Sequence, residues 1–370
     1  MKILFIAPRF HTNQFPIIKF LKKKNKVNFL SQYVGQTENH KLLKPDICSG
    51  VFFPFNLNFK NLDISTSSFI PNIFFLIKYF KKKNPEIVII RHHYKIFSYV
   101  CIFILKIMKK KIIIYDQNEI TLNVKKKFLN KLWFFSEFFF RTYILNIPWV
   151  SPINNFKDKK IKSNCFYLPF AVDKNLKKKV NRTNKKITFL SIGKFRKRKN
   201  LIMLIRSVET IIKKFNFKIK LIIVGEAINE EEKKNYNNII NFIKIKKLQK
   251  IIFLKTNVPH SNIGKFYKGS DIFVLPSTRE PAAISVLEAA SFGLPVILSN
   301  TSGTRCYFKN NFNAKFFKDN DQTDLQNKMI FFLKSITNIK KYNQNIIKSF
   351  NKTMSLENYE KNFKKILQKI

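Results

Sequence analysis

Residues 271–305, DIFVLPSTREPAAISVLEAASFGLPVILSNTSGTR, decide the fold. Their pattern predicts a buried strand, a turn, a helix that ends at Gly293, and a second strand, over residues 271–275, 276–281, 284–291 and 296–299. Such a unit presents the N-terminus of a helix at the carboxyl edge of a parallel sheet. Unpaired N–H groups and the helix dipole favour phosphate there. The stretch therefore predicts a place to hold a nucleotide diphosphate.

Two carboxylates lie at the predicted helix, one before it and one within it. Glu280 precedes the helix and Glu288 follows eight residues later, a separation of roughly 12 Å at about 1.5 Å rise per residue. With a diphosphate at the helix tip, Glu280 could accept hydrogen bonds from a sugar and Glu288 from ribose. The spacing alone favours a plainer interpretation, in which Glu280 is a capping acid and Glu288 a surface residue of the helix.

The longer stretch of sequence around these two carboxylates favours the donor-binding interpretation over the plainer one. It contains two glutamates separated by seven residues, Glu280 to Glu288, followed by Ala289-Ala290 and by Gly293-Leu294-Pro295-Val296-Ile297. This segment resembles the donor-binding segment of the retaining glycosyltransferases of the GT-B fold, family 4. The resemblance implies that the backbone at Ala282, Ala283 and Ile284 contacts the donor. Many members of the family have glycine where Ala283 stands.

A second part of the resemblance lies in the basic loop Gly193-Lys194-Phe195-Arg196-Lys197-Arg198-Lys199-Asn200. In the family, this loop supplies two cations to the donor diphosphate, one directly after the glycine and one five residues later. Those positions are Lys194 and Lys199 here, beside Gly193. Two cations on one diphosphate offset the charge that develops as the glycosidic bond breaks. Without the downstream match, the loop would be interpreted as a solvated basic turn.

The resemblance implies an α/β fold with two Rossmann-like doubly wound domains facing a cleft (GT-B) and a C-terminal helix that crosses back to the first domain. The length of 370 residues suits two cores. We expect an acceptor domain over residues 1–173, a linker over 174–186, a donor domain over 187–340 and the crossing helix over 341–370. The last of these is expected as one Lys-rich helix, 341–369.

Apolar runs and helical periodicity alternate along both halves, as in parallel sheets covered on both faces. Strands are expected at 2–7, 27–30, 87–90, 112–115, 187–192, 220–224 and 250–254. Residues 166–173 resemble the strand and turn that close the first domain in the family. Helices are expected at 16–24, 69–83, 95–108, 129–145, 201–214, 229–246, 261–268 and 321–335, with Ser261 capping one of them. Residues 31–68 show weak periodicity and are expected to be irregular.

Polar loops after the first-domain strands are expected to face the acceptor. They contain the acceptor-side candidates, which are His11, Asn13, His92, His93, Asp116 and Asn118. Adjacent side chains diverge, and no third ligand is spaced with the two histidines, so the sequence does not favour a metal there. Relatives often carry a histidine in the loop where Asp116 stands, and a glycine-rich loop after the first strand that this chain lacks.

The formal charge of +48 at pH 7 is extreme, and basic residues outnumber acidic ones in both halves of the chain. Three interpretations stay open: compositional bias, attraction to an anionic membrane surface, and nucleic-acid binding. Lysine clusters beside apolar runs, at residues 22–24, 81–83, 109–111 and 125–127, could place the first domain on anionic lipid. No concentrated patch with aromatic stacking motifs supports nucleic acid.

The four cysteines are isolated, which indicates a reducing compartment and no structural metal. The apolar strand at residues 3–7 is too short for the core of a signal peptide. Three apolar runs, at 69–80, 99–108 and 132–150, lack about 18 uninterrupted apolar residues, and buried helices are expected instead. The predicted location is cytoplasmic, with peripheral attachment to the inner face of the membrane as an option.

The resemblance implies a hexosyltransferase-like enzyme that needs no metal or other cofactor and transfers sugar with retention. Its partners would be a nucleotide diphosphate sugar and a glycan or lipid-linked acceptor, in surface polysaccharide or lipopolysaccharide synthesis. No side chain qualifies as a general base, so the donor diphosphate could itself accept the acceptor proton. The alternatives are a nucleotide-sugar epimerase or hydrolase of the same fold and a basic nucleic-acid-binding protein. The base, the sugar and the linkage stay open.

Overall fold

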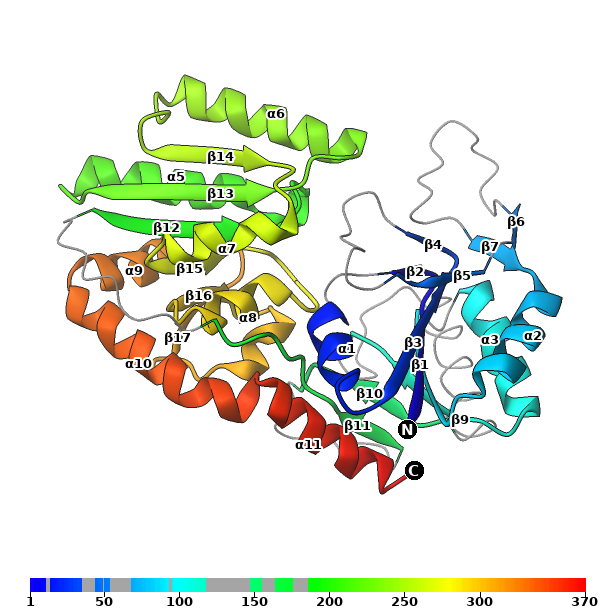
Figure 1. Cartoon of the computed structure of the whole chain (residues 1–370). Helices are drawn as coiled ribbons and strands as arrows, with labels where there is room; N and C mark the ends of the chain where they lie inside the picture. The colour runs from blue at the N-terminus through cyan, green and yellow to red at the C-terminus, as the bar shows by residue number, and fades with distance from the viewer. Residues whose placement is uncertain are drawn as a thin grey trace, which may run out of the picture. The chain divides into compact units, whose positions relative to one another are not determined.

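The computed structural model describes residues 1–10, 14–34, 44–48, 50–53, 68–92, 95–117, 147–154, 164–175 and 186–370. The chain forms two compact units (Figure 1). The first unit contains residues 1–169 together with 360–370, and the second contains residues 170–359. Each unit is an α/β layer structure built on a parallel sheet.

The first unit is built on a seven-stranded sheet in the order β11-β10-β9-β8-β1-β3-β5. All neighbouring strands in it run parallel. The strands are β1 (Lys2–Ile6), β3 (Lys26–Ser31), β5 (Asp46–Ile47), β8 (Ile87–Arg91), β9 (Lys111–Tyr115), β10 (Trp149–Ser151) and β11 (Cys165–Tyr167). Every residue of β8 is buried, because helices cover both faces of a parallel sheet.

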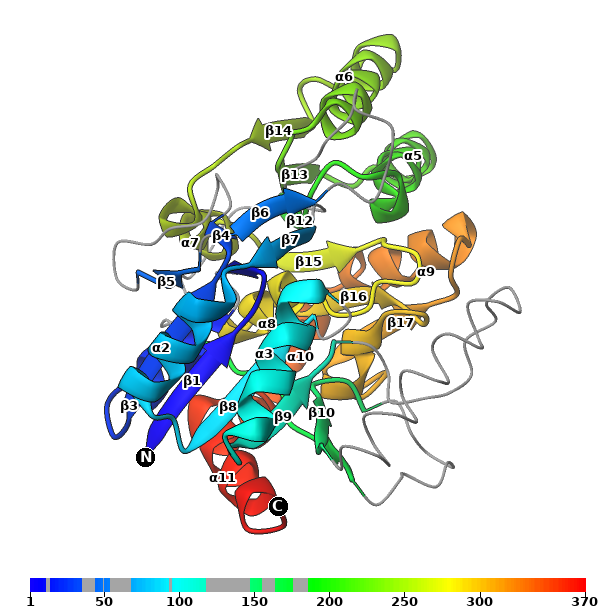
Figure 2. The same ribbon diagram turned by 90° about the vertical axis from the view of Figure 1, so that its right-hand side faces the viewer.

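Helices α2 (Ile73–Lys83) and α3 (Ile96–Ile107) lie together on one face of this sheet (Figure 2), and α1 (Phe15–Leu21) belongs to the same unit. Leu76, Phe80, Phe97, Cys101 and Leu105 of α2 and α3 pack into one core with the sheet. The expected helix over 69–83 begins later, because residues 68–71 form a strand and the Asn72 side chain caps the helix by accepting from Phe75 N–H at 3.0 Å.

The expectation that residues 31–68 are irregular is wrong for the described part of that segment. It contains β4 (Tyr33–Val34), β5 and β6 (Gly50–Phe53), while β7 (Ser68–Pro71) begins at its end. β4 pairs with β2 (Arg9–Phe10), and β6 with β7. β4 and β5 have two residues each, too few for alternation to be visible, and the sequence of β6, Gly50-Val51-Phe52-Phe53, does not alternate between apolar and polar residues. The expected helix 129–145 and most of the expected linker 174–186 lie outside the described residues.

The second unit has a six-stranded sheet in the order β14-β13-β12-β15-β16-β17, with all neighbours parallel. Its strands are β12 (Ile187–Ile192), β13 (Ile219–Gly225), β14 (Ile252–Thr256), β15 (Ile272–Leu275), β16 (Val296–Ser299) and β17 (Ala314–Phe317). In chain order this is the 3-2-1-4-5-6 arrangement of the Rossmann fold. The order reverses between β12 and β15, so the loops after these two strands lie side by side at the carboxyl edge.

Helices cover the second sheet, and their apolar sides form its core (Figure 1). They are α5 (Leu201–Lys214), α6 (Glu230–Ile245), α7 (His260–Lys268), α8 (Ile284–Ser291), α9 (Gln322–Leu333) and α10 (Ile336–Thr353). Helix α7 begins at His260 with Pro259 at its cap position, so the expectation that Ser261 caps it is wrong. Proline suits this place because the first N–H groups of a helix have no intrahelical partner.

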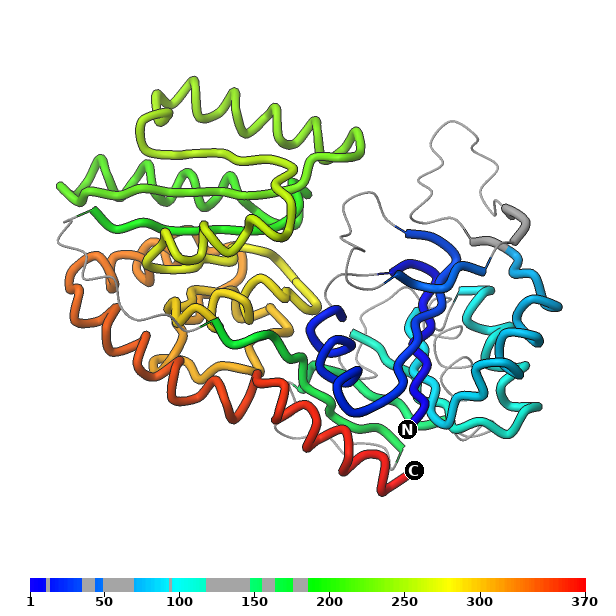
Figure 3. Tube along the Cα trace, in the orientation of Figure 1, coloured from blue at the N-terminus to red at the C-terminus, as the bar shows by residue number. Residues whose placement is uncertain are grey.

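The C-terminal segment is two helices rather than the single helix expected over 341–369. The trace in Figure 3 bends between α10 and α11 (Leu356–Leu367). Ser355 causes the break, since its hydroxyl accepts from Asn358 N–H at 3.1 Å and caps the second helix. The end of α11 belongs to the first unit, where Glu360 lies 3.4 Å from the Lys24 ammonium.

Within the described ranges, no helix combines the length and the apolar character needed to cross a membrane. Trp149–Ser151, at the end of one apolar run expected to be helical, is the buried strand β10. A short fully buried strand and a buried helix segment have the same apolar composition, so the sequence pattern could not separate them.

Candidate functional site

Two loops meet at the switch point of the second sheet. The loop after β12 contains Gly193–Asn200, and the loop after β15 contains the segment that leads into α8. Thr278 N–H donates to the carbonyl of Arg198 at 2.9 Å, so the two backbones are joined directly. Gly303 N–H donates to the carbonyl of Glu280 at 2.8 Å and ties in the loop after β16. The carboxyl edge is thereby a connected surface of three loops.

Glu280 is the centre of this surface. Its carboxylate is buried and forms ion pairs with Lys199, at 2.5 Å from the ammonium, and with the guanidinium of Arg198. Lys199 is itself buried, with 10% of its side chain exposed, whereas Arg198 is 43% exposed. The sequence predicted Glu280 and Lys199 separately, and the fold brings them into contact.

Burial and the ion pairs together set the protonation states of Glu280 and Lys199. Burial alone would raise the pKa of the Glu280 carboxyl, but the nearby Lys199 and Arg198 outweigh it and lower that pKa below its ordinary value. Glu280 is therefore ionised at neutral pH. Burial lowers the pKa of the Lys199 ammonium, an effect that Glu280 opposes. A buried anion with two cations on it leaves net positive charge for an anionic ligand.

Gly193 allows the close approach of Lys199 to the loop backbone. A Cβ at Gly193 would lie 3.1 Å from Lys199 Cε. Lys194, the other predicted phosphate contact, instead pairs with Glu226 after β13 at 3.0 Å. Lys194 and Lys199 therefore have different carboxylate partners in this structure.

Glu288 lies on α8 and is held by two side chains. Tyr267 of α7 donates its hydroxyl proton to Oε2 at 2.8 Å, and His260 Nε2 lies 3.0 Å from Oε1. Tyr267 is buried, and its ring stacks on Phe292 with the centroids 5.2 Å apart. The carboxylate of Glu288 thus has a fixed orientation before any ligand binds.

The N-terminus of α8 faces the same edge. Ala283 is its cap residue with φ −91° and ψ 107°, and no side chain caps this end. An alanine in place of the family's common glycine needs no unusual backbone angle here. The eight-residue helix begins at Ile284, and Ala282 and Ala283 connect it to Glu280.

The stability contributed by the pair of His260 and Glu288 should depend on pH. The hydrogen bond to Glu288 raises the pKa of His260 above its ordinary value of 6.5. The folded form then binds the proton more tightly than the unfolded form, so the pair stabilises fully below about pH 6.5 and its contribution is lost as pH rises through the raised pKa. In NMR titrations, we expect His260 to titrate above pH 6.5 in the wild type and at a lower pH in Glu288→Gln than in the wild type. Titration of His260 below 6.5 in the wild type would contradict the pair.

The first unit has a corresponding switch point between β1 and β8. His92 follows β8 with φ 49°, and Asp116 follows the neighbouring strand β9. Burial, together with the positive charges of Arg91, Lys95 and Arg9, lowers the pKa of His92 to about 3. Its imidazole is therefore neutral at pH 7 and can donate or accept a hydrogen bond.

The remaining acceptor-side candidates, His11, Asn13, His93 and Asn118, lie outside the described residues. In the part of the chain that the structure does describe, no three His, Cys, Asp or Glu side chains gather into a metal site. None of the four cysteines, all of which the structure describes, is in a disulfide.

Sequence reasoning missed the residues that fix the predicted ones in place. Arg198 was one of five basic residues in a loop, and nothing in the pattern indicated that it would pair with Glu280. Tyr267 had no signal in the sequence, since it is an aromatic residue at a core position of α7. Glu226 directly follows β13, and its place in the sequence does not indicate that it pairs with Lys194. Their partners are distant in the sequence and are brought together by the sheet order.

Two parallel α/β sheets of Rossmann type, the second with loops that meet at its switch point, are the architecture of the GT-B fold. Residues 172–351 match the sequence model of the family "Glycosyl transferases group 1". This match lies within the second unit and includes Glu280 and Glu288 as well as the basic loop.

Comparison with curated proteins gives a partial match. The chain is similar to the UDP-Gal:alpha-D-GlcNAc-diphosphoundecaprenol alpha-1,3-galactosyltransferase of Escherichia coli, with 35% identity over 106 residues, 29% of this chain and 25% of that enzyme. Two further curated relatives are matched over 37% and 32% of their own lengths. The chain therefore spans well under half the length of each of these relatives.

Solved structures match over the whole chain. A glycosyltransferase from Rickettsia africae superposes with a TM-score of 0.73 at 17% identity and covers 99% of this chain and 98% of its own. The Anabaena protein HepE, in complex with UDP and glucose, gives a TM-score of 0.74 at 11% identity with 100% of both chains covered. These matches establish the GT-B fold for the chain.

Proposed function

We propose that the chain transfers a sugar, with retention at the anomeric carbon, from a nucleotide diphosphate sugar to a glycan or lipid-linked acceptor. The observation that carries this proposal is the buried Glu280 between Lys199 and Arg198, at the switch point where helix α8 also begins. The family match over residues 172–351 supports the same reaction class. We place the enzyme in surface polysaccharide or lipopolysaccharide synthesis.

On the donor side, each residue has a proposed role. Lys199 and Lys194, with Arg198, stabilise the diphosphate while the bond between the anomeric carbon and the phosphate oxygen breaks. Glu280 positions hydroxyls of the donor sugar and keeps Lys199 in place. Glu288, already oriented by Tyr267, accepts hydrogen bonds from ribose hydroxyls. The backbone at Ala282–Ile284 contributes N–H groups to the phosphate.

On the acceptor side, the first unit supplies the binding surface. The attacking hydroxyl oxygen forms a bond to the anomeric carbon, and its proton passes to the departing diphosphate oxygen. The reaction then needs neither a metal nor a separate general base. His92 is neutral at pH 7 and is proposed to orient the acceptor by hydrogen bonding rather than by charge.

The printed names of similar proteins suggest which ligands to test first. HepE is in complex with UDP and glucose, and the Escherichia coli relative is named for UDP-Gal and a diphosphoundecaprenol acceptor. We propose UDP sugars as the donors to test first and a lipid diphosphate-linked sugar as an acceptor class.

The proposed site makes a direct binding prediction. Calorimetry with UDP, GDP, ADP and their sugars should give selective binding of one base to the wild type. Glu288→Gln should weaken that binding by about tenfold or more, since it replaces a charged acceptor of ribose hydrogen bonds, which are worth about 1.5–3 kcal/mol each. Lys199→Ala should weaken it at least as much, because a buried cation next to the diphosphate is lost.

A matched control separates site binding from general attraction to a basic protein. Lys233→Ala on α6 removes one exposed lysine of the same unit and should leave nucleotide binding unchanged. Equal, weak and salt-sensitive binding of every nucleotide to all variants would overturn the proposed site. Turnover of the donor at the same rate with and without any acceptor would instead identify a hydrolase.

A further inference from the structure

An apolar groove lies between α2 and α3 in the first unit. It encloses about 690 Å³ and is lined mainly by aliphatic and aromatic side chains of both helices, among them Ile73, Ile77, Tyr99, Phe103 and Ile107. Beside it, Phe74 is 86% exposed, Phe103 69% and Ile107 67%. An exposed apolar patch of this kind marks an interaction surface when it is continuous across two elements.

The patch follows from the way α3 is built. Phe97, Cys101 and Leu105 are four residues apart and are buried against the sheet. The opposite side of the same helix carries Phe103 and Ile107, which point outward. A helix that covers a sheet normally has polar residues on its outer side. The outer side of α3 is apolar as well, so it matches an apolar partner rather than water.

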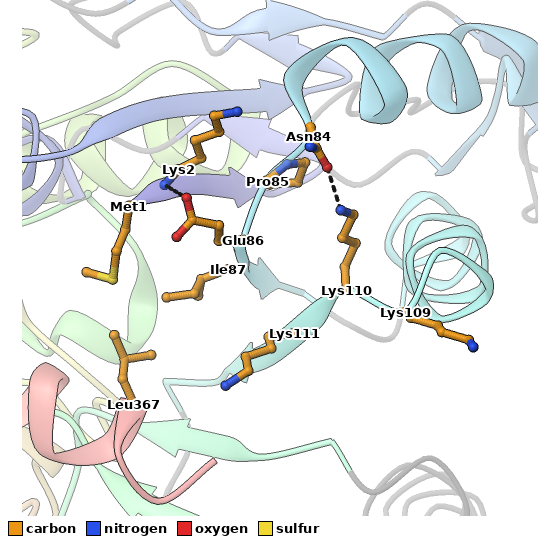
Figure 4. Close-up of a pocket in the computed structure, with 10 residues that line it drawn as sticks. All are labelled: Met1, Lys2, Asn84, Pro85, Glu86, Ile87, Lys109, Lys110, Lys111 and Leu367. Atoms are coloured by element: carbon orange, nitrogen blue, oxygen red, sulfur yellow. Dashed lines mark hydrogen bonds between the residues drawn. The ribbon is translucent and has the colours of Figure 1, made fainter.

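Lysines border the patch, and acidic residues are absent from both helices. Lys78, Lys81 and Lys82 are exposed on α2, and Lys106 lies on α3. Residues 73–83 and 96–111 contain no Asp or Glu. The positive border continues in Lys109, Lys110 and Lys111, which line a neighbouring pocket of about 600 Å³ (Figure 4).

The lysines of that neighbouring pocket do not converge on one point. Figure 4 shows Lys109 directed away from the pocket, while the Lys110 ammonium lies 2.5 Å from Asn84 Oδ1. A discrete phosphate ligand would need several cations directed at one place. A spread of lysines beside apolar side chains instead suits an extended anionic surface.

We propose that the face formed by α2 and α3 docks the first unit onto an anionic lipid bilayer. Phe74, Phe103 and Ile107 enter the boundary between headgroups and acyl chains, and the lysines contact anionic headgroups through their flexible stems. The sign of the charge selects this occupant: a second copy of the same face would bring lysine against lysine. The proposal rests on the first unit alone and does not depend on the proposed reaction.

Vesicle binding of the full chain tests the proposal. Sedimentation with vesicles of 30% phosphatidylglycerol in phosphatidylcholine should capture the wild type, and pure phosphatidylcholine should capture much less. The double variant Phe74→Ser, Phe103→Ser should partition at least about tenfold less, since it removes two aromatic side chains that would leave water on docking. Lys81→Ser, Lys82→Ser should weaken binding and reduce its dependence on salt.

Matched variants control for the high net charge and for exposed apolar residues in general. Ile245→Ser, Ile336→Ser removes two exposed apolar side chains from the second unit, and Lys233→Ser, Lys234→Ser removes two exposed lysines there. Both should bind vesicles like the wild type. Equal losses in the control and the α2/α3 variants would overturn the proposal, because charge and apolar area would then act without regard to position.

Insertion can be observed directly with a reporter. With vesicles, the tryptophan added in Phe103→Trp should shift its emission to shorter wavelength and should be quenched by brominated phosphatidylglycerol. The tryptophan added in Ile245→Trp should show neither effect. A blue shift of Phe103→Trp that follows protein concentration without lipid would identify a second copy as the occupant and overturn the proposal. Circular dichroism and the midpoints of urea unfolding should match the wild type in all variants, which shows that the first unit still folds. Unchanged nucleotide binding without lipid separates this test from that of the reaction.

Discussion

Lys199→Met is expected to lower the free energy of unfolding of the second unit by about 3 kcal/mol, because it leaves Glu280 buried with a single, half-exposed partner. Only 5% of the Glu280 side chain is exposed, so water cannot replace the lost ammonium. Methionine keeps the apolar stem of lysine, which confines the change to the charge. Urea unfolding followed by circular dichroism measures the loss, and hydrogen exchange in β12 and β15 assigns it to this unit.

The double variant Lys199→Met, Glu280→Gln tests whether the loss of stability comes from the broken ion pair between these two residues. Removing both charges should restore most of the stability, since a broken buried pair costs more than a pair that is absent. Both single variants and the double variant should lose sugar transfer by about a hundredfold or more, if these groups act on the diphosphate. A double variant as unstable as the sum of the singles would show that the two residues do not interact.

The same pair sets the acid sensitivity of the second unit. Lys199 and Arg198 hold the pKa of Glu280 below its ordinary value of 4.5 despite its burial. The unfolded state therefore takes up the proton first, and the stabilisation is present above about pH 4.5 and is lost as pH falls through the lowered pKa. The double variant Lys199→Met, Glu280→Gln should not show this loss of stability in acid.

The parts of the fold that were predictable from sequence are those with long apolar runs. β8 and β9 contain the continuous apolar runs 87–90 and 112–114, which lead into polar loops, and a parallel sheet produces that pattern. The short strands β4, β5 and β6 were missed because pairs of two to four residues depend on neighbours distant in the chain. The break at Ser355 was missed for a different reason: a serine within a Lys-rich helical pattern is common, and only its hydrogen bond to Asn358 ends one helix and begins the next.

The candidate site was predictable where the chemistry is local. Glu280, Glu288 and Lys199 stand at fixed places in two motifs, and the sheet order brings the two motifs together. The residues that orient them, Arg198 and Tyr267, come from the tertiary fold and could not be chosen from sequence spacing. Residue roles on the acceptor side stay predictions, since only His92 and Asp116 among the named candidates are described.

Gly225→Ala should destabilise the second unit by about 3 kcal/mol, at the upper end of what overpacking typically costs. A Cβ at Gly225 would lie 2.4 Å from the carbonyl oxygen of Gly193 and 2.6 Å from the Phe195 ring. The ring is fully buried against Tyr236, and the carbonyl is backbone, so neither can move away cheaply. The methyl group would displace the loop after β12 and with it Lys199. Nucleotide affinity should therefore fall together with the midpoint of urea unfolding.

Two other glycines serve as controls for this substitution. Gly264→Ala should stabilise the protein by about 0.5–1 kcal/mol, because it lies inside α7 and its Cβ would meet only Phe292 at an ordinary 3.5 Å. Gly193→Ala should cost less than about 1 kcal/mol, since its Cβ would meet the flexible end of Lys199. It should nevertheless weaken nucleotide binding, because Lys199 must move. Equal stabilities of Gly225→Ala and Gly193→Ala would mean that the backbone at Gly225 can shift, and the rigid support that we assign to Phe195 would be wrong.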